Sequence, residues 1–230
     1  MKFSLIVLCK NEIESLRVIL PRINKNWVDE IIIVDGGSTD GSIEYARGLG
    51  FFVLNQKEKG WRHKAIVAGT KEGFAVATGD VIITFTPDGN MIPEKIPELV
   101  AKMKEGYDIV AVSRYAKGAR SYDDTLISGF GNWMFTLLVK LLFRTQCTDL
   151  LGFFLAFRKD ILRELKIPMT LTLGTKLIIR SAKKGLKYTE IPGSEPKRIG
   201  GRSYRSIIIN GTIEVWSILE ELLLYKFQKL

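Results

Sequence analysis

A buried strand that ends in a sharp polar turn lies near the middle of this chain. Residues 81–85 are apolar or β-branched, and the chain then turns at TPDGN (86–90). The first part has the composition of a buried strand, and the turn brings the Asp88 carboxylate to the strand's carboxyl end. Because open α/β sheets bind their ligands at that edge, the stretch predicts an α/β fold with a site beside Asp88.

The same pattern of strand followed by helix recurs on both sides of this stretch. Strands are expected at 3–9, 30–34, 51–54, 81–85, 107–112, 151–157 and 186–191, and helices at 12–20, 43–49, 64–77, 93–104, 131–143, 159–165, 173–184 and 207–230. Either Thr39 or Asp40 is expected to cap the helix at 43–49. Strands that alternate with helices predict βαβ units and a mostly parallel central sheet flanked by helices.

Charge and composition narrow the classes of function. The chain has 34 Lys+Arg against 25 Asp+Glu, a formal net charge of +9, which favours an anionic partner. Nucleic acid is not expected, because no recognition motif with interleaved aromatic residues accompanies the charge. His63 is the only histidine, so we expect neither a zinc site nor a Ser-His-Asp triad, and we expect His63 to lie in an exposed loop.

The two cysteines and the apolar segments indicate in which cellular compartment the protein is expected. Cys9 and Cys147 lie far apart within apolar stretches, which predicts buried free thiols in a reducing compartment. The first residues contain too short an apolar run for a signal peptide. No stretch approaches the roughly 18 uninterrupted apolar residues of a membrane span. We therefore expect a cytoplasmic protein, and peripheral attachment to the cytoplasmic face of a membrane stays open.

Asp88 and Asn90 could bind a metal ion. They place two oxygen ligands on one turn, which suits a hard divalent cation that holds a diphosphate. The alternative is that Asp88-Gly89 simply forms a turn.

Four motifs follow one another in a fixed order: KNE (10–12), VDGGSTDGS (34–42), TPDGNMIPE (86–94) and SR (113–114). Together they resemble the family 2 inverting glycosyltransferases, and most closely the dolichol-phosphate mannose synthase-like branch, with PxYNE, VDDGSTDGT, DADxQxxPE and GSR. The later half matches more loosely.

The resemblance implies a GT-A (nucleotide-diphospho-sugar transferase) fold. The catalytic domain would cover 1–205, with a nucleotide-binding half at 1–114 and an acceptor-side half at 115–205, and a C-terminal amphipathic helix would cover 206–230.

The resemblance also implies roles for individual residues. The residues expected at the nucleotide are Cys9, Asn11, Glu12, Asp35, Ser38, Lys64 and Asp88. The residues expected to bind Mg²⁺ or Mn²⁺ are Asp88 and Asn90. The expected catalytic residues are Asp149, Arg114, Arg198 and Arg202, and the expected acceptor-binding residues are Arg114, Arg202 and Ser203.

The chemistry of sugar transfer agrees with these roles. A UDP- or GDP-linked sugar leaves as a nucleoside diphosphate, so negative charge grows on the phosphate in the transition state. A divalent ion and forked arginines stabilise that charge. An acceptor oxygen on a polyprenyl or dolichyl phosphate is already ionised near neutral pH, so it needs little help from a general base. A glycan or small-molecule acceptor remains an alternative.

Departures from the branch pattern support a second hypothesis. Thr86 replaces the first Asp of DxD, Gly36 replaces the second Asp of VDD, and Tyr204 stands where Lys is usual. The GxGxA segment of the branch is missing, and Asp149 is one residue closer to Gly152 than the corresponding Asp is in the branch. The helix near 175–176 lacks the Glu that the branch often has. The chain could therefore be a catalytically weak or inactive homologue that binds sugar nucleotides or serves as a scaffold subunit. A sugar-phosphate nucleotidyltransferase is not expected, because LCKNE (8–12) offers no Gly-rich phosphate loop.

Two late segments are more apolar than a lone surface helix needs, namely 131–143 and 207–230. A helix that is apolar nearly all round is usually buried. It can instead lie in a membrane interface, where Trp and basic residues anchor it. Packing on the domain, packing on a second copy or a membrane subunit, and attachment to a membrane that carries a lipid-phosphate acceptor all remain open.

Overall fold

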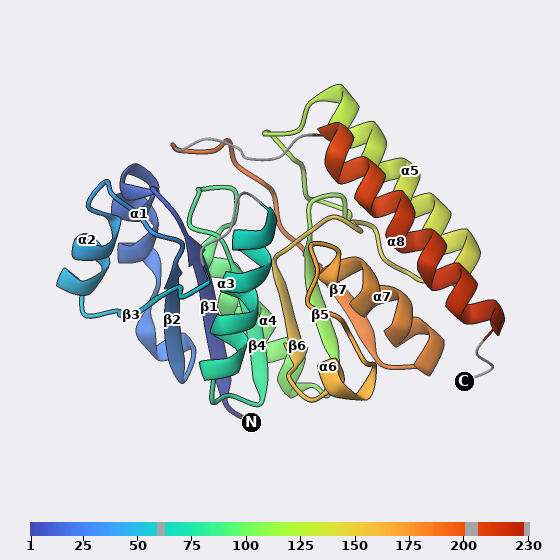
Figure 1. Cartoon of the computed structure of the whole chain (residues 1–230), viewed down its shortest axis with the longest axis horizontal. Coiled ribbons are helices and arrows are strands. Elements are labelled where there is room, and N and C mark those ends of the chain that lie inside the picture. Colours follow the sequence, from blue (N-terminus) through green and yellow to red (C-terminus); the bar gives the residue numbers. More distant parts are fainter. Residues whose placement is uncertain (59–62, 201–206, 228–230) are drawn as a thin grey trace.

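A computed structural model describes residues 1–58, 63–200 and 207–227 (Figure 1). Within them, the strands are β1 (Phe3–Cys9), β2 (Glu30–Asp35), β3 (Phe52–Asn55), β4 (Val81–Phe85), β5 (Ile109–Ser113), β6 (Leu155–Arg158) and β7 (Tyr188–Pro192). The α-helices are α1 (Ile13–Ile19), α2 (Ser42–Gly48), α3 (His63–Val76), α4 (Ile96–Lys104), α5 (Leu126–Phe143), α6 (Ile161–Glu164), α7 (Leu173–Lys184) and α8 (Ile207–Phe227). Short 3₁₀ helices are η1 (Leu20–Arg22), η2 (Lys25–Trp27) and η3 (Pro93–Lys95).

The described strands form one mostly parallel sheet in the order β3-β2-β1-β4-β6-β5-β7. β1 pairs in parallel with β2 and β4, β2 with β3, and β5 with β7. β6 is antiparallel to both of its neighbours, β4 and β5, so β4 and β5 run in the same direction. The carboxyl ends of all the strands except β6 therefore meet at one edge, which confirms the expected mostly parallel α/β sheet.

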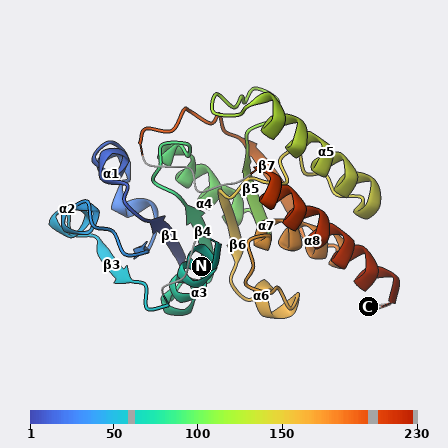
Figure 2. The same cartoon turned by 45° about the horizontal axis from the view of Figure 1, so that its top comes forward.

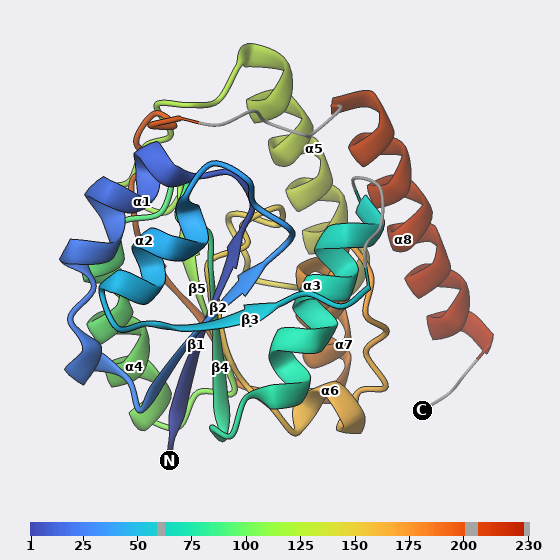
Figure 3. The same cartoon turned by 60° about the vertical axis from the view of Figure 1, so that its left-hand side comes forward.

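The core lies on both faces of this sheet because alternate side chains of a strand point to opposite faces. Leu5 and Val7 of β1 pack with α1 and α4, whereas Ile6 packs on the other face with Phe74 of α3 and Leu177 of α7. Figure 3 shows the sheet between one layer of α1, α2 and α4 and another of α3, α6 and α7. Both faces are covered, which is why these strands are apolar throughout.

Some element boundaries differ from the predicted ones for local reasons. α5 begins at Leu126, five residues before the expected start, because Thr125 and Ser128 form a capping box. α2 is preceded by Gly41 in a left-handed conformation (φ 90°), so neither Thr39 nor Asp40 is its N-cap. β6 covers only Leu155–Arg158. The residues before it, predicted to be strand, line the site instead.

α5 and α8 lie together outside the two helical layers (Figure 2). With α7 they bury a separate apolar cluster that includes Phe135, Val139, Ile178 and Ile218. Within the described residues, α5 alone has the length and composition of a membrane span, and 28% of it is buried. The expectation that no segment would approach a membrane span was therefore too strict, although Asn132, Thr136 and Lys140 interrupt the apolar sequence of α5.

Polar pairs attach α8 to α7. The Lys176 Nζ lies 2.5 Å from Glu220, and the Arg180 Nη2 lies 2.6 Å from Glu221. The Ser217 hydroxyl lies 2.9 Å from the Thr172 hydroxyl. α8 therefore turns much of its polar side towards the protein, the reverse of an ordinary surface helix.

Candidate active site

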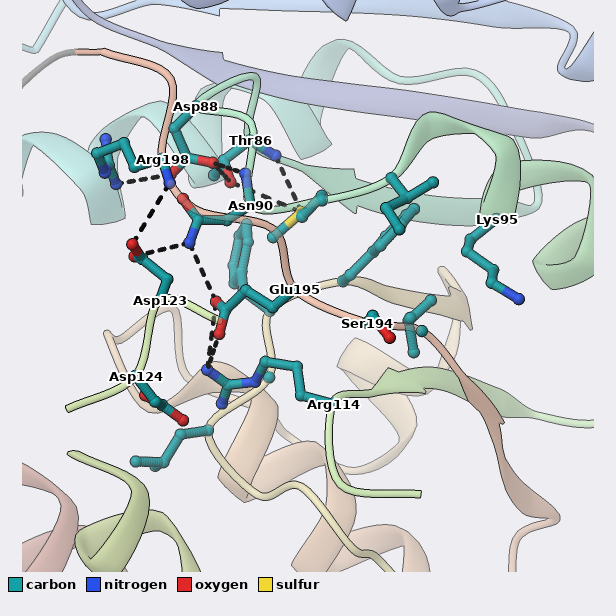
Figure 4. Close-up of a pocket in the computed structure, with 18 of the residues that line it drawn as sticks. Thr86, Asp88, Asn90, Lys95, Arg114, Asp123, Asp124, Ser194, Glu195 and Arg198 are labelled. Atoms are coloured by element: carbon teal, nitrogen blue, oxygen red, sulfur yellow. Dashed lines mark hydrogen bonds and ion pairs between the residues drawn. The ribbon is translucent and has the colours of Figure 1, made fainter. Parts of the chain in front are cut away.

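The functional side chains gather where the parallel strands end. Glu12 follows β1, Asp88 follows β4, Arg114 follows β5 and Glu195 follows β7. Figure 4 shows Asp88, Arg114 and Glu195 around one hollow, together with Arg198 from the loop after β7. These residues come from distant parts of the chain, and the shared strand direction brings them together.

Asp88 is a buried carboxylate at the end of β4, with donors on both of its oxygens. The Arg198 Nη2 donates to Oδ2 at 2.6 Å, which is a charge-assisted bond. The Thr86 hydroxyl and the Asn90 N–H each donate to Oδ1 at 3.2 Å. The Ile199 N–H donates to the Asp88 carbonyl at 3.0 Å, so the loop after β7 covers this turn. Thr86 thus gives Asp88 a hydroxyl partner in place of a second carboxylate.

Asn90 lies between two carboxylates from other segments (Figure 4). Its Nδ2 donates to Asp123 at 2.8 Å and to Glu195 at 3.3 Å. Its Oδ1 is buried and has no hydrogen-bond partner among the described residues. A buried amide oxygen without a partner is costly, so Oδ1 is a candidate ligand atom for a cation.

Arg114 is fixed by a forked ion pair with Asp149. Its Nε lies 2.7 Å from Oδ2 of Asp149, and its Nη2 lies 2.8 Å from Oδ1. The Asn132 Nδ2 donates to the same carboxylate at 3.1 Å. The Asp149 side chain is fully buried beneath the guanidinium, and Asp149 lines neither of the cavities described below. It therefore positions Arg114, whereas the sequence predicted a direct catalytic role.

Glu195 is a site residue that the sequence analysis did not identify. It accepts a bond from the Ser121 hydroxyl at 2.5 Å and lies 3.3 Å from the Arg114 Nη1. With its bond from Asn90, it joins the loop after β5 to the turn after β4. Its position directly after a parallel strand could have identified it. The sequence analysis considered only the basic residues of that loop.

The loops after β1 and β2 are joined by hydrogen bonds. Asp35 is 2% exposed, and its carboxylate accepts bonds from the Gly37 N–H at 2.8 Å and the Ser38 hydroxyl at 2.5 Å. The Ser38 hydroxyl also accepts from the Asn11 N–H at 2.8 Å, and the Asn11 Oδ1 accepts from the Thr39 N–H at 2.8 Å. Asp35, Ser38 and Asn11 therefore shape the loops, and none of the three lines the larger cavity.

Burial perturbs two ionisable groups at the end of β1. Burial, together with the nearby carboxylates of Asp35 and Glu12, raises the pKa of the Cys9 thiol to about 12. Cys9 therefore stays a neutral thiol. Burial also raises the pKa of Glu12, against the lowering effect of Ser15 and of Arg198, whose Nη1 donates to Glu12 at 3.3 Å. Arg198 thus connects the ends of β1 and β4.

Two cavities meet at this edge. The smaller, about 330 Å³, lies among Asn90, Lys95 and Glu195. The larger, about 630 Å³, extends from Lys10 and Gly36 to the space between α5, α7 and α8. Residues common to both include Asp88, Arg114 and Arg198. The charged side chains at the strand ends therefore line the junction of the two cavities.

The remaining predicted residues have different placements. Cys9 lines the larger cavity, whereas Lys64 is exposed and is not among its lining residues. His63 is the first residue of α3 and lines the cavity, with a buried Nε2 that has no partner among the described residues, so the expectation of an exposed loop position was wrong. Cys9 and Cys147 are free and buried, as predicted. Arg202 and Ser203 lie outside the described residues.

The turn after β4 fits a divalent cation whose ligands come partly from the protein and partly from a substrate. The Asp88 carboxylate and the unpartnered Asn90 Oδ1 are hard oxygen donors. Within the described residues, no group of three or more His, Cys, Asp or Glu side chains could hold an ion. A cation held here would complete its coordination with water and phosphate oxygens, as Mg²⁺ commonly does.

Sequence comparisons place most of the chain in one family. The family model described as glycosyl transferase family 2 matches residues 4–166. A dolichyl-phosphate hexose transferase of Haloferax volcanii is 28% identical over 173 residues, which are 74% of this chain and 72% of that protein. A dolichol-phosphate mannosyltransferase of Pyrococcus furiosus is 28% identical in an alignment of 222 positions, which covers 88% of this chain but only 59% of that protein.

Solved structures share the fold. Glucosyl-3-phosphoglycerate synthase from Mycobacterium tuberculosis, in complex with Mn²⁺, UDP and phosphoglyceric acid, matches with a TM-score of 0.73 at 18% identity, covering 96% of this chain and 78% of that one. The same enzyme with Mn²⁺ and UDP-glucose matches with a TM-score of 0.66 at 22% identity, covering 97% and 78%. The predicted GT-A fold is confirmed.

Proposed function

The chain belongs to glycosyl transferase family 2, and we propose that it transfers a hexose from a UDP- or GDP-linked sugar to a polyprenyl or dolichyl phosphate, with inversion. The observation that carries the proposal is the continuity of the larger cavity. It runs from the ends of β1 and β2, past Asp88, Arg114 and Arg198, to the space beside α5 and α8. One cavity thus joins the expected nucleotide site to an apolar pair of helices.

The charged residues at the junction fit the demands of the reaction. The acceptor phosphate oxygen attacks the anomeric carbon, the bond from that carbon to the diphosphate oxygen breaks, and negative charge grows on the leaving phosphate. Arg114 and Arg198 supply positive charge there, and Asp149 holds Arg114 in place. Asp88 and Asn90 would hold Mg²⁺ or Mn²⁺, which supplies Lewis-acid stabilisation of the diphosphate when bound. An ionised acceptor phosphate has no proton to lose, so the reaction needs no general base.

The exposed faces of α5 and α8 support a lipid acceptor. On α5, Asn132 and Thr136 are buried, whereas Leu126 and Leu141 are 93% and 72% exposed. On α8, the polar residues pack on α7, and Trp216 is 72% exposed. The exposed apolar face of α5 and α8 consists of Leu126, Ile127, Phe130, Trp133, Leu137, Leu141, Ile208, Trp216, Leu219 and Leu223. Contiguous exposed apolar surface marks an interaction site.

We assign this apolar face to the interface of a membrane that carries the acceptor. Its tryptophans suit the boundary between headgroups and acyl chains. The net charge of +9 suits an anionic cytoplasmic leaflet. Peripheral attachment there would bring a lipid phosphate to the side of the larger cavity that is lined by the first turns of α5, near Ile127 and Ser128.

Titration calorimetry tests the transferase proposal directly. UDP, GDP and their hexose conjugates are titrated with and without Mn²⁺ into the wild type and Asp88→Ala. We expect one nucleotide to bind more tightly with Mn²⁺ and Asp88→Ala to lose that dependence, because Asp88 supplies the carboxylate of the proposed metal site. Asp80→Ala, which removes an exposed aspartate before β4, is the matched control and should bind as the wild type does.

The second candidate function is a scaffold subunit with a weak or inactive site. The hydroxyl of Thr86 beside Asp88 favours it, because the turn carries one carboxylate fewer than the branch pattern. Absence of nucleotide binding to the wild type, with or without Mn²⁺, would support the scaffold and contradict the transferase.

A further inference from the structure

We propose that Glu214 of α8, with Thr175 of α7 and Asn210, binds the hydroxyl groups of the donor's hexose ring. All three residues line the larger cavity at the end formed by α7 and α8. The proposal rests on the proposed function, because that function places the nucleotide at the opposite end, near Lys10 and Gly36. It identifies a specificity site outside the segment matched by the family model, which ends at residue 166.

Glu214 is a buried carboxylate with spare capacity for hydrogen bonds. It is 6% exposed, and within the described residues it accepts a hydrogen bond from the Thr175 hydroxyl. Lys176 is near enough to act on it electrostatically, but the Lys176 Nζ is bound to Glu220 at 2.5 Å. An ionised carboxylate can accept about four hydrogen bonds. Glu214 therefore has room for donors from a ligand in the cavity.

The cavity wall around Glu214 is otherwise apolar or neutral. It includes Phe135, Leu151, Leu173, Gly174 and Ile213. Burial raises the pKa of Glu214 to about 7, against the lowering effects of Thr175 and Lys176. A carboxyl group in such a place is costly unless donors satisfy it. A polar group on an apolar wall is how a ligand pocket commonly fixes the orientation of its ligand.

The docking of α8 does not depend on Glu214 alone. Further along the helix, Glu220 binds Lys176 and Glu221 binds both Arg180 and Lys183. These pairs hold α8 on α7 without facing the larger cavity. Glu214 is therefore free to serve a ligand, and its substitution should leave the helix in place.

Among the ligands of the proposed reaction, the hexose fits this end of the cavity best. A phosphate group would be repelled by an ionised Glu214. A prenyl chain would bury the carboxyl group without giving it a donor. Sugar hydroxyls donate to carboxylates, and a hexose ring also has apolar C–H faces for a wall of Phe and Leu.

The test compares two affinities in the same protein. Calorimetry measures the Kd of UDP, GDP, UDP-glucose and GDP-mannose for the wild type and Glu214→Gln, which keeps the shape and removes the charge. For the nucleotide that binds, we expect the sugar conjugate to bind Glu214→Gln roughly tenfold more weakly than it binds the wild type. The Kd of the free nucleotide should not change.

Two further variants make the test specific. Glu220→Gln removes a carboxylate from the same helix outside the cavity, and it should leave both affinities unchanged, which separates ligand contact from helix docking. Asn210→Ala should weaken only the sugar conjugate and serves as an independent test if Glu214→Gln does not fold. Unchanged affinity for the conjugate in folded Glu214→Gln and Asn210→Ala would overturn this proposal alone. Failure of the wild type to bind any nucleotide would overturn the proposed function and this proposal with it.

Discussion

At the scale of single residues, the site is distinguished by an arginine on its central carboxylate. The Arg198 Nη2 lies 2.6 Å from Asp88, and its Nη1 lies 3.3 Å from Glu12. A guanidinium on Asp88 competes with a metal ion for the same negative charge. Because Thr86 contributes a hydroxyl and no charge, the Arg198 guanidinium and a metal ion would both have to bind the single carboxylate of Asp88.

Restoring a second carboxylate should favour the metal. We expect Thr86→Asp to bind Mn²⁺ at least several-fold more tightly than the wild type, because hard cations gain affinity from added carboxylate ligands. Thr86→Asn, of similar size but neutral, is the control and should show no such gain. Calorimetric titration of Mn²⁺ in the presence of the bound nucleotide provides the measurement. An unchanged Mn²⁺ affinity in Thr86→Asp would mean that residue 86 does not reach the ion.

At the scale of elements, α8 is a helix with its polar side turned inward. Ser217 and Glu221 are 2% and 1% exposed, whereas Trp216 is 72% exposed. The sequence predicted that this helix is amphipathic. Its charged partners on α7 determine that the polar side faces the protein. The Glu214 carboxylate on α8 lies next to Thr175 of α7 and accepts a hydrogen bond from its hydroxyl.

The packing of α8 should make stability depend on pH. Glu214 has a folded pKa of about 7 against 4.5 for an ordinary Glu, so between those values the folded state holds a proton that the unfolded state has lost. Stability from this group is therefore present at low pH and lost as pH rises through 7. The free energy of unfolding of the wild type, relative to Glu214→Gln, should fall by roughly 2–3 kcal/mol between pH 5 and 8.

Chemical denaturation at a series of pH values measures this difference. Glu98→Gln, at a glutamate on the surface of α4, provides the control, because its difference from the wild type should vary little over the same range. The groups facing Glu214 from α7 are Thr175 and Lys176. A constant difference between the wild type and Glu214→Gln would show that Glu214 has the same pKa in the folded and unfolded states.

At the scale of the whole molecule, charged and apolar surfaces are separated. The strand ends bring together arginines and carboxylates, whereas α5 and α8 carry exposed apolar side chains. These two helices lie together at one side of the molecule (Figure 1). A cavity of about 630 Å³ connects the strand ends to these helices. This arrangement supports the proposed transfer of a hexose from a soluble donor to a lipid acceptor.

Membrane attachment should depend on the apolar face of α5 and α8. We expect the wild type to co-sediment with vesicles of phosphatidylcholine and phosphatidylglycerol. The combined change Trp133→Ser and Trp216→Ser should weaken partitioning by roughly tenfold or more, because each removes a large apolar contact. Phe52→Ser, at an aromatic residue of β3 that is 59% exposed, is the control and should sediment as the wild type does. A wild type that stays in solution as a dimer, and becomes monomeric in the double variant, would assign the face to a second copy.

Local patterns predicted much of the fold and part of the site. Hydrophobic periodicity is a property of neighbouring residues, so it predicted the parallel strands and most helices. The polar turn after the strand at 81–85 indicated Asp88. The resemblance to the family motifs implied that Glu12, Arg114 and Arg198 belong to the same site.

The remaining features depend on residues that are distant in sequence. Glu195 contacts Arg114 across 81 positions, and Glu214 contacts Thr175 across 39. No local pattern encodes such pairs, because they arise only when the sheet order and helix packing bring the segments together. The sequence alone therefore determined which strands end in chemically useful groups. Tertiary packing decided that Asp149 positions Arg114, that Glu195 joins the site and that α8 turns its charges inward, because burial and pairing of charge are properties of the assembled fold.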